Sequence, residues 1–159
     1  MSFYELDFNE FAISQYSLIG IHTTLNDYKL AYLLNSKLEC FFEKANFCLD
    51  IKNKNKEIVS FPIYEYVNEK EDTNWFLINN VSKKKVEIEA IGLFMKRTTS
   101  VVEYLVSEKK KVDYFLKIEG DFKETFVDSL INNIKTIPQV VTSYQIDIDT
   151  LKSKDFLIF

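Results

Sequence analysis

Few residues in this 159-residue chain have the chemistry of a catalytic or metal site. His22 is the only histidine, and Cys40 and Cys48 are the only thiols. A cysteine and the histidine could meet in space as a nucleophile and its base. The other interpretation is an ordinary histidine at a strand end and two reduced, packed cysteines. A zinc site is not indicated, because the chain has neither C-x-x-C nor H-x-x-x-H spacing. We expect no metal and no cofactor.

Glycine, with 3 residues, is too scarce to build the loops that cradle phosphate. Neither G-x-G-x-x-G nor G-x-x-x-x-G-K occurs, which excludes nucleotide binding through such loops. The acidic groups at 69–72 and 147–149 lack the glycine of a calcium loop, so they are interpreted as solvated turn carboxylates. The formal net charge of −4 argues against a dedicated nucleic-acid binder.

Two lysine runs, Lys83–Lys85 and Lys109–Lys111, are predicted to lie in turns. They could bind phosphate, with Tyr104, Tyr114 and Phe115 as stacking surfaces for single-stranded bases. An RNA-associated accessory protein is therefore the first alternative function. The acidic total and the single arginine count against it.

Aromatic residues are abundant, with 14 Phe, 9 Tyr and 1 Trp. Tyr64 and Tyr66 fall on one predicted strand, and Trp75 and Phe76 on the next. Because residues of both strand parities are aromatic, some are expected to point outward. Exposed aromatic clusters are typical of protein interfaces, so these four residues are candidate binding residues for a protein partner or a homodimer. A small-molecule sensor, with an aromatic pocket between helices and sheet, is a second alternative.

The elements that would position these residues follow from hydrophobic periodicity. Strands are predicted at 16–23, 40–51, 59–67, 74–81, 86–91, 99–106, 112–119 and 140–148, with a basic turn at 82–85. Cys40 and Cys48 would share one strand about 26 Å apart, at ~3.3 Å per residue, too far for a disulfide. Amphipathic helices are predicted at 25–38 and from 121 to a stop at Pro138.

This order predicts an α+β fold in one domain spanning 1–159: a largely antiparallel sheet with both amphipathic helices on one face. It also admits two ferredoxin-like halves. The N-terminus has no signal-peptide pattern, and no apolar run approaches the ~18–20 residues of a membrane span, so we expect a cytoplasmic protein with no membrane contact.

Residues 106–114 read V-S-E-K-K-K-V-D-Y, which resembles the signature of the bacterial IPExxxVDY family. Val106 and Ser107 replace the Ile and Pro of that signature. The likeness extends to residues 29–35, 64–66, 75–78, 114–118 and 157–159. It implies a cytosolic bacterial domain without an established activity. We expect a non-enzymatic interaction or regulatory module that self-associates, and the motif adds three candidate binding residues: Glu108, Asp113 and Tyr114.

Overall fold

A computed structural model describes residues 15–89 and 96–159. The helices are α2 (Asp27–Leu38) and α3 (Glu124–Lys135), with short 3-10 turns η1 (Ser107–Lys109), η2 (Ile148–Thr150) and η3 (Lys154–Leu157). The strands are β1 (Tyr16–Thr23), β2 (Glu43–Lys52), β3 (Ile58–Asn68), β4 (Thr73–Asn79), β5 (Val81–Glu89), β6 (Lys96–Tyr104), β7 (Tyr114–Glu119) and β8 (Val140–Ile146).

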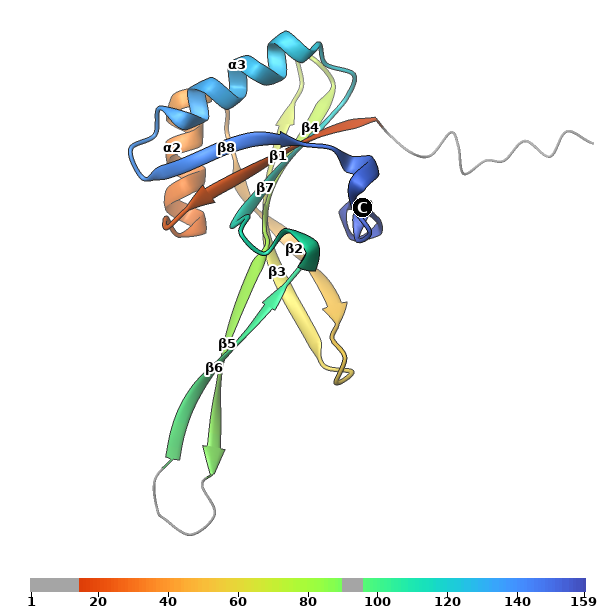
Figure 1. Cartoon of the computed structure of the whole chain (residues 1–159). Helices are drawn as coiled ribbons and strands as arrows, with labels where there is room; N and C mark the ends of the chain where they lie inside the picture. Colours follow the sequence, from red (N-terminus) through yellow and green to blue (C-terminus); the bar gives the residue numbers. More distant parts are fainter. Residues whose placement is uncertain (1–14, 90–95) are drawn as a thin grey trace, which may run out of the picture.

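Six strands form one sheet in the order β2-β3-β4-β7-β1-β8, and every neighbouring pair is antiparallel. β7 and β8 both pair with β1, so they run parallel to each other and α3 connects them. β5 and β6 form a separate two-stranded ribbon that projects from this body (Figure 1). The predicted α+β fold is confirmed. The two ferredoxin-like halves are not confirmed, since both helices belong to a single shared sheet.

Both helices cover the same face of the sheet. Their buried residues recur at spacings of three and four, which places them on one stripe of each helix. Alternate residues of the central strands point at this stripe, as expected from the period of two in a strand. The resulting core includes Leu30 and Leu34 of α2, Val127 and Ile134 of α3, and Ile19, Leu77 and Leu116 of the sheet.

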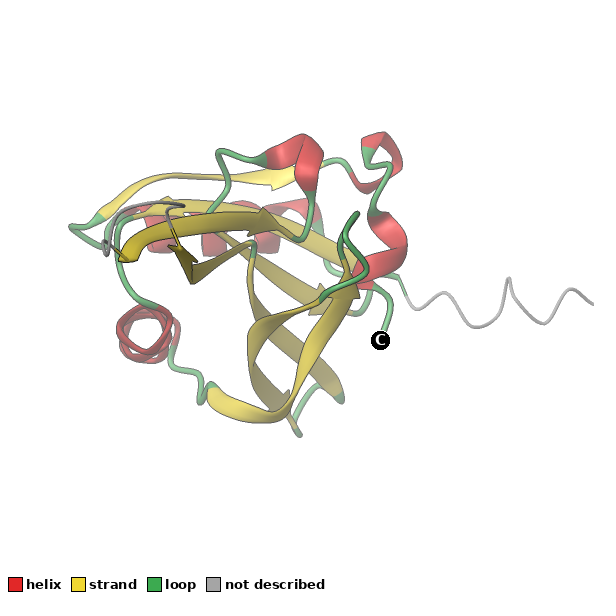
Figure 2. Cartoon of the chain, turned by 90° about the horizontal axis from the view of Figure 1, so that it is seen from below, coloured by secondary structure: helices red, strands yellow, loops and turns green. Residues whose placement is uncertain are grey.

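The opposite face is covered by the chain's own loops. Leu105, Val106 and Val112, which flank η1, pack on this face together with Leu151 and Leu157 of the C-terminal segment. Figure 2 views the molecule from below and shows α2 almost end-on, with strands between it and the C-terminal turns. In the central strand β4, alternate parity therefore does not leave the aromatic residues exposed. The expectation that some point fully outward is wrong for Trp75 and Phe76, both of which are buried.

Several predicted boundaries are corrected. Cys40 precedes β2 rather than belonging to it, although both cysteines are free thiols. Cys40 is packed, but Cys48 is exposed. Residues Ser82–Lys85 lie in β5 and not in a turn, because the chain continues from β4 into the ribbon after one residue, Asn80. The predicted strand 86–91 ends outside the described residues, and the predicted strand 99–106 begins earlier, at Lys96.

Candidate functional site

Asn80 holds the joint between the six-stranded body and the β5–β6 ribbon, which we call the arm. Its side chain is fully buried, and its Nδ2 donates to the carbonyl oxygens of Lys109 and Val112 at 2.9 and 2.8 Å. Its Oδ1 accepts from the backbone N–H of Val106 at 2.8 Å. The Asn80 carbonyl also accepts from the N–H of Leu105, where the chain returns from the arm. One amide thus ties the exit and the return of the arm to the η1 loop.

Residues of the segment 106–114 that match the signature link separate parts of the body by hydrogen bonds. The Glu108 carboxylate accepts from the backbone N–H and the Oγ of Ser153, each at 2.8 Å. Asp113 Oδ2 accepts from the N–H of Thr23 at 2.9 Å, and the Tyr114 hydroxyl donates to the Leu25 carbonyl at 2.7 Å. Val112, also part of the motif, is buried in the core. Each of these candidate binding residues is therefore engaged by the fold itself.

The protonation states of two motif residues suit these bonds. For Glu108, desolvation raises the pKa, but the hydrogen bonds from Ser153 and neighbouring backbone outweigh it, so the pKa is lowered and the acceptor stays ionised. For Tyr114, burial, followed by the nearby charges of Asp27 and Asp113, raises the pKa. The phenol therefore keeps the proton that it donates.

Open hollows lie on the part of the body that the structure describes, and three of them border candidate residues or the helices and β1. One, of about 500 Å³, lies at the start of α2 and is bordered by Asp27, Lys83, Asp113 and Tyr114. A second, of about 570 Å³, lies between α2, α3 and the β3–β4 turn, and a third, of about 770 Å³, lies beside the N-terminal end of β1. The first hollow brings together two residues of the motif and one of a lysine run.

The candidate aromatic residues separate onto two faces. Tyr66 and Trp75 meet edge to face on the helix side, with ring centroids 5.6 Å apart, and Tyr64 packs half-buried against the same core. Phe76 points to the opposite face, where its ring centroid lies 4.9 Å from that of Phe159. The most exposed aromatic side chain near this group is that of Phe41, which lies at the rim of the second hollow. The four residues do not form one aromatic patch.

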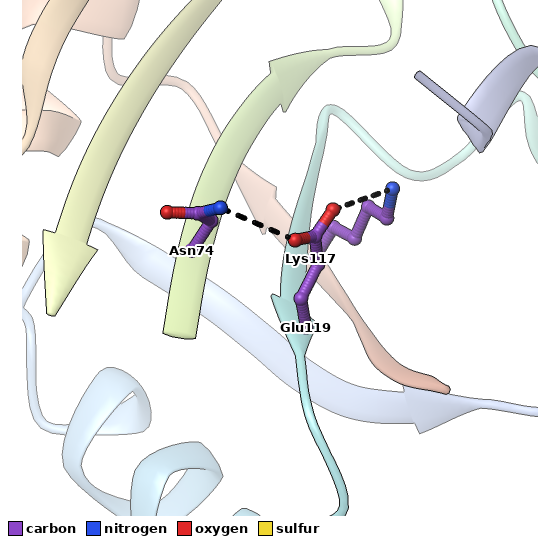
Figure 3. Close-up of polar contacts among 3 residues, drawn as sticks. All are labelled: Asn74, Lys117 and Glu119. Carbon is purple, nitrogen blue, oxygen red and sulfur yellow. Dashed lines mark hydrogen bonds and ion pairs between the residues drawn. The ribbon is translucent and has the colours of Figure 1, made fainter. Parts of the chain in front are cut away.

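Sequence reasoning missed a buried lysine, Lys117, which is 1 % exposed. Its Nζ lies 3.5 Å from Glu119 Oε1, while Asn74 Nδ2 donates to the other oxygen of that carboxylate at 3.5 Å (Figure 3). The same Nζ lies 4.3 and 4.9 Å from the ring centroids of Phe159 and Tyr16, so the cation is held over aromatic faces. Burial lowers the pKa of Lys117, and Glu119 opposes that shift. The contact fastens the last residue over the sheet.

The surroundings of His22 and Cys40 do not suit the suggested pair of a nucleophile and its base. His22 Nε2 lies 2.9 Å from the hydroxyl of Tyr144, its hydrogen-bond partner in the described chain. Cys40 is buried, and burial raises the pKa of its thiol to about 12, so it carries no nucleophilic thiolate at neutral pH. In residues 15–89 and 96–159, no group of three or more His, Cys, Asp or Glu side chains is placed to hold a metal ion.

The arm is packed less by other elements of the chain than the body is. β5 is hydrogen-bonded to β6 alone in the described chain, so each strand of the arm has one unpaired long edge. Ile88 is 51 % exposed, and Val101 and Val102 are 41 % and 40 % exposed. Lys83–Lys85 are exposed on the same ribbon. A two-stranded ribbon alone is only marginally stable in water, so this element is suited to pairing with something else.

The second lysine run lies at the base of the arm, where β5 and its lysines begin. Lys109 is tied to Asn80 through its carbonyl, and Lys110 Nζ lies 5.6 Å from the ring centroid of Tyr104. The other two suggested stacking surfaces, Tyr114 and Phe115, are buried, so that part of the RNA hypothesis is wrong. Tyr104 remains half-buried beside the lysines.

The described residues of the arm belong to neither buried core, so the rest of the chain leaves the arm largely uncovered. No helix among the residues described is long and apolar enough to cross a membrane. In comparisons with known proteins, no family model, curated protein or solved structure matches the chain.

Proposed function

We propose that this protein acts by binding rather than by catalysis, as an interaction module that self-associates through the β5–β6 arm. The proposal rests on the difference between the sheet and the arm in how far each is packed by the rest of the chain. The central strands of the six-stranded sheet are packed on both faces by helices or loops, whereas the described residues of the arm belong to neither buried core and each of its two strands has an unpaired edge. Exposed strand edges are templates for pairing with another chain, and natural proteins either block or use them.

Assembly of the arm would also stabilise it. Burying apolar surface contributes roughly 25 cal/mol per Å², and new ladder bonds would satisfy backbone groups along the edge. Lys84, Val86 and Ile88 lie on one face of the ribbon, opposite Val101, Thr99 and Arg97 in the ladder register. That face combines apolar residues with cations, a composition suited to an interface with a polar rim.

We also propose that the chain is a bacterial cytosolic protein of the IPExxxVDY family. Support comes from the structural roles of the four residues that match the signature. Glu108, Asp113 and Tyr114 each make a long-range hydrogen bond that holds two distant segments together, and Val112 is in the core. Residues with such roles are ones that a fold family would be expected to share.

The experiment is sedimentation velocity on the full chain and on a variant without the arm. Val81 and Tyr104 face each other in the ladder, so residues 82–103 can be replaced by an Asn-Gly turn, which closes a two-residue hairpin. At about 100 μM, where a micromolar dimer is largely assembled, we expect the full chain at twice 18.8 kDa and the variant as a monomer with an unchanged melting profile. A full chain that stays at 18.8 kDa would overturn the proposal.

A second candidate function is RNA association at the base of the arm, favoured by Lys110 over the Tyr104 ring and by the exposed Lys83–Lys85 on the strand that pairs with that of Tyr104. Its test is an electrophoretic shift of single-stranded RNA at low salt. Replacing Lys83–Lys85 by serine should abolish the shift, and replacing Lys52, Lys54 and Lys56 by serine serves as the matched control. No shift by the unmodified chain at high micromolar concentration removes this candidate.

A further inference from the structure

The second hollow, between α2, α3 and the β3–β4 turn, has an apolar border that the chain leaves exposed. Phe41 is 75 % exposed and Val67 is 58 % exposed, and both border the hollow. The half-buried Tyr66 and the buried Trp75 lie beside them, and the ring centroids of Trp75 and Phe126 are 6.3 Å apart. Aromatic rings from three parts of the chain therefore line one opening of about 570 Å³, a size typical of binding sites.

The charges at this hollow are mostly negative. Its border carries three glutamates, Glu39, Glu69 and Glu71, against one lysine, Lys70. All four side chains are exposed, and in residues 15–89 and 96–159 none of the three carboxylates forms a salt bridge. Complementary charges steer the encounter of two molecules and select between partners. The hollow is therefore suited to a cationic partner.

The fold holds both sides of the hollow in place. At the end of α2, Glu39 has left-handed backbone geometry with φ 53°, and Asn35 Oδ1 accepts from the N–H of Phe42 at 2.7 Å, which fixes the connection between α2 and β2. Across the hollow, Trp75 Nε1 donates to Thr73 Oγ1 at 3.3 Å. A site that is formed before binding loses less conformational freedom when a partner docks.

Tyr66 joins the apolar and the charged parts of the hollow. Its ring packs edge to face against those of Trp75 and Phe42. Burial, followed by the nearby Cys40 and Glu71, raises the pKa of Tyr66. The phenol is therefore uncharged at neutral pH, so the negative charge comes from the carboxylates while the aromatic rings offer faces to a cation.

We propose that this hollow is a docking site for a cationic segment of another protein, in which lysine or arginine side chains flank an apolar residue. The apolar residue would pack against Phe41 and Val67, and the cations would lie over the exposed ring and near Glu69 and Glu71. Charge complementarity favours this occupant over an acidic or a neutral segment. The open shape favours a side chain of a larger partner over a small molecule, because small-molecule pockets bury most of their ligand's surface.

This site goes beyond the proposed self-association, because it lies away from the arm. The β3–β4 turn precedes β4 and the arm follows it, so the hollow and the arm are at opposite ends of that strand (Figure 1). Sedimentation of the full chain tests the arm, and peptide binding tests the hollow. Either proposal can therefore fail without the other.

The experiment is a fluorescence titration of the full chain with the acetylated and amidated hexapeptide Lys-Leu-Lys-Leu-Lys-Leu. Trp75 is the only tryptophan and the peptide has no aromatic residue, so a saturable change in emission reports on the hollow. We expect such a change, weakening as NaCl is raised, and none with the peptide Glu-Leu-Glu-Leu-Glu-Leu. Equal binding of the two peptides, or no change with either up to about 1 mM, would overturn the proposal.

Two variants locate the binding. Phe41→Ser removes the exposed ring, and Glu69→Gln/Glu71→Gln removes two carboxylates, and we expect each to raise the dissociation constant by roughly fivefold to tenfold. The matched control for the ring is Tyr32→Ser, since Tyr32 is 73 % exposed on α2 and does not line the hollow. This control should change the constant by no more than about twofold.

The matched control for the charges is Asp50→Asn/Glu57→Gln. These residues lie toward the other end of the β2–β3 hairpin from the hollow, and their loss should also change the constant by no more than about twofold. If either control weakens binding as much as the variants of the hollow, the assignment to this hollow is wrong. If Trp75 emission changes with protein concentration alone, and replacing Lys83–Lys85 by serine removes that change, the occupant is a second copy of this chain and the assignment to another protein is wrong.

Discussion

The body and the arm of this protein differ in whether they have a buried core. In the body, buried polar side chains are bonded: Asn80 uses both amide donors and its oxygen, and Lys117 is held by a carboxylate and aromatic rings. Among the described residues, Ser143 Oγ is the one buried side-chain polar atom without a hydrogen-bond partner. In the arm, apolar side chains and strand edges face solvent. The contrast indicates that stability is concentrated in the body and self-association in the arm.

The largest effect on stability is expected from the joint between the two regions. Asn80→Ala removes three hydrogen bonds and leaves the Val106 N–H and the Val112 carbonyl buried without partners. An unsatisfied buried group costs about 1–3 kcal/mol, so we expect a loss of roughly 3–5 kcal/mol in the free energy of unfolding. Urea denaturation measures this. The neighbouring Asn79→Ala is the control and should cost far less, because no hydrogen bond of the Asn79 side chain is found in the described chain.

The next largest effect is expected at the buried lysine. Lys117→Ala removes a packed stem and the contact with the Phe159 ring, and should cost about 2–4 kcal/mol. Lys117→Met keeps most of the volume and removes the buried charge, so we expect a change of less than about 1.5 kcal/mol. Equal losses for the two variants would show that the charge, and not the packed stem, is what Lys117 contributes.

The same residue gives stability a pH dependence. Burial lowers the pKa of Lys117 in the folded state, so between that pKa and the ordinary value of ~10.4 the unfolded chain binds more protons. Stability contributed by this group therefore rises with pH across that window. Wild-type protein should gain stability relative to Lys117→Met as the pH is raised from neutral toward 10, measured by urea midpoints at each pH. A difference that shrinks over this range contradicts the assignment.

A smaller effect is expected where Glu108 holds the C-terminal segment. Glu108→Gln weakens the two bonds from Ser153 and should cost about 0.5–1.5 kcal/mol. Because the folded-state pKa is lowered, the contribution is complete above the ordinary carboxyl pKa of ~4.3 and is lost as the pH falls through the lower folded value. Wild type and variant should therefore converge in stability at acid pH. Glu124→Gln, an exposed residue at the start of α3, serves as the control.

The smallest effect on the body is expected from the arm. Ile88→Thr and Val101→Thr change exposed side chains, and we expect each to alter the free energy of unfolding by less than about 0.5 kcal/mol. The same variants should measurably weaken self-association, because both residues are exposed apolar side chains of the arm. Loss of several kcal/mol in unfolding would show that the arm contributes to the stability of the body and would remove the contrast between the two regions.

Local periodicity was sufficient to predict much of the body. The first strand is observed with the predicted bounds, Tyr16–Thr23, and α2 begins two residues after its predicted start. Both patterns arise from one buried face, and a residue's neighbours in sequence carry that information. The alternation of 86–91 predicted the second half of β5 as a strand, but its first half was predicted as a turn at 82–85. The three consecutive lysines there, all exposed, lack the alternation that identifies strands.

The side-chain contacts that link distant segments of the body could not be predicted from sequence, because the residues that they join are far apart along the chain. Asn80 bonds residues 26 to 32 positions away, and Lys117 lies under Phe159 at the end of the chain. No periodic pattern reports such contacts. The motif residues Glu108, Asp113 and Tyr114 were identified by resemblance alone, which did not reveal that they hold segments of the fold together.

Hydrogen exchange of the full chain, followed as a function of protein concentration, tests the separation of body and arm most directly. Amides of the body are expected to exchange at the same slow rates at low and high concentration, since their bonds are internal. Amides along the strands of the arm are expected to become more protected as concentration rises, because the arm gains a partner strand. Protection that rises along β2 or β8 and leaves β5 and β6 unchanged would contradict the account.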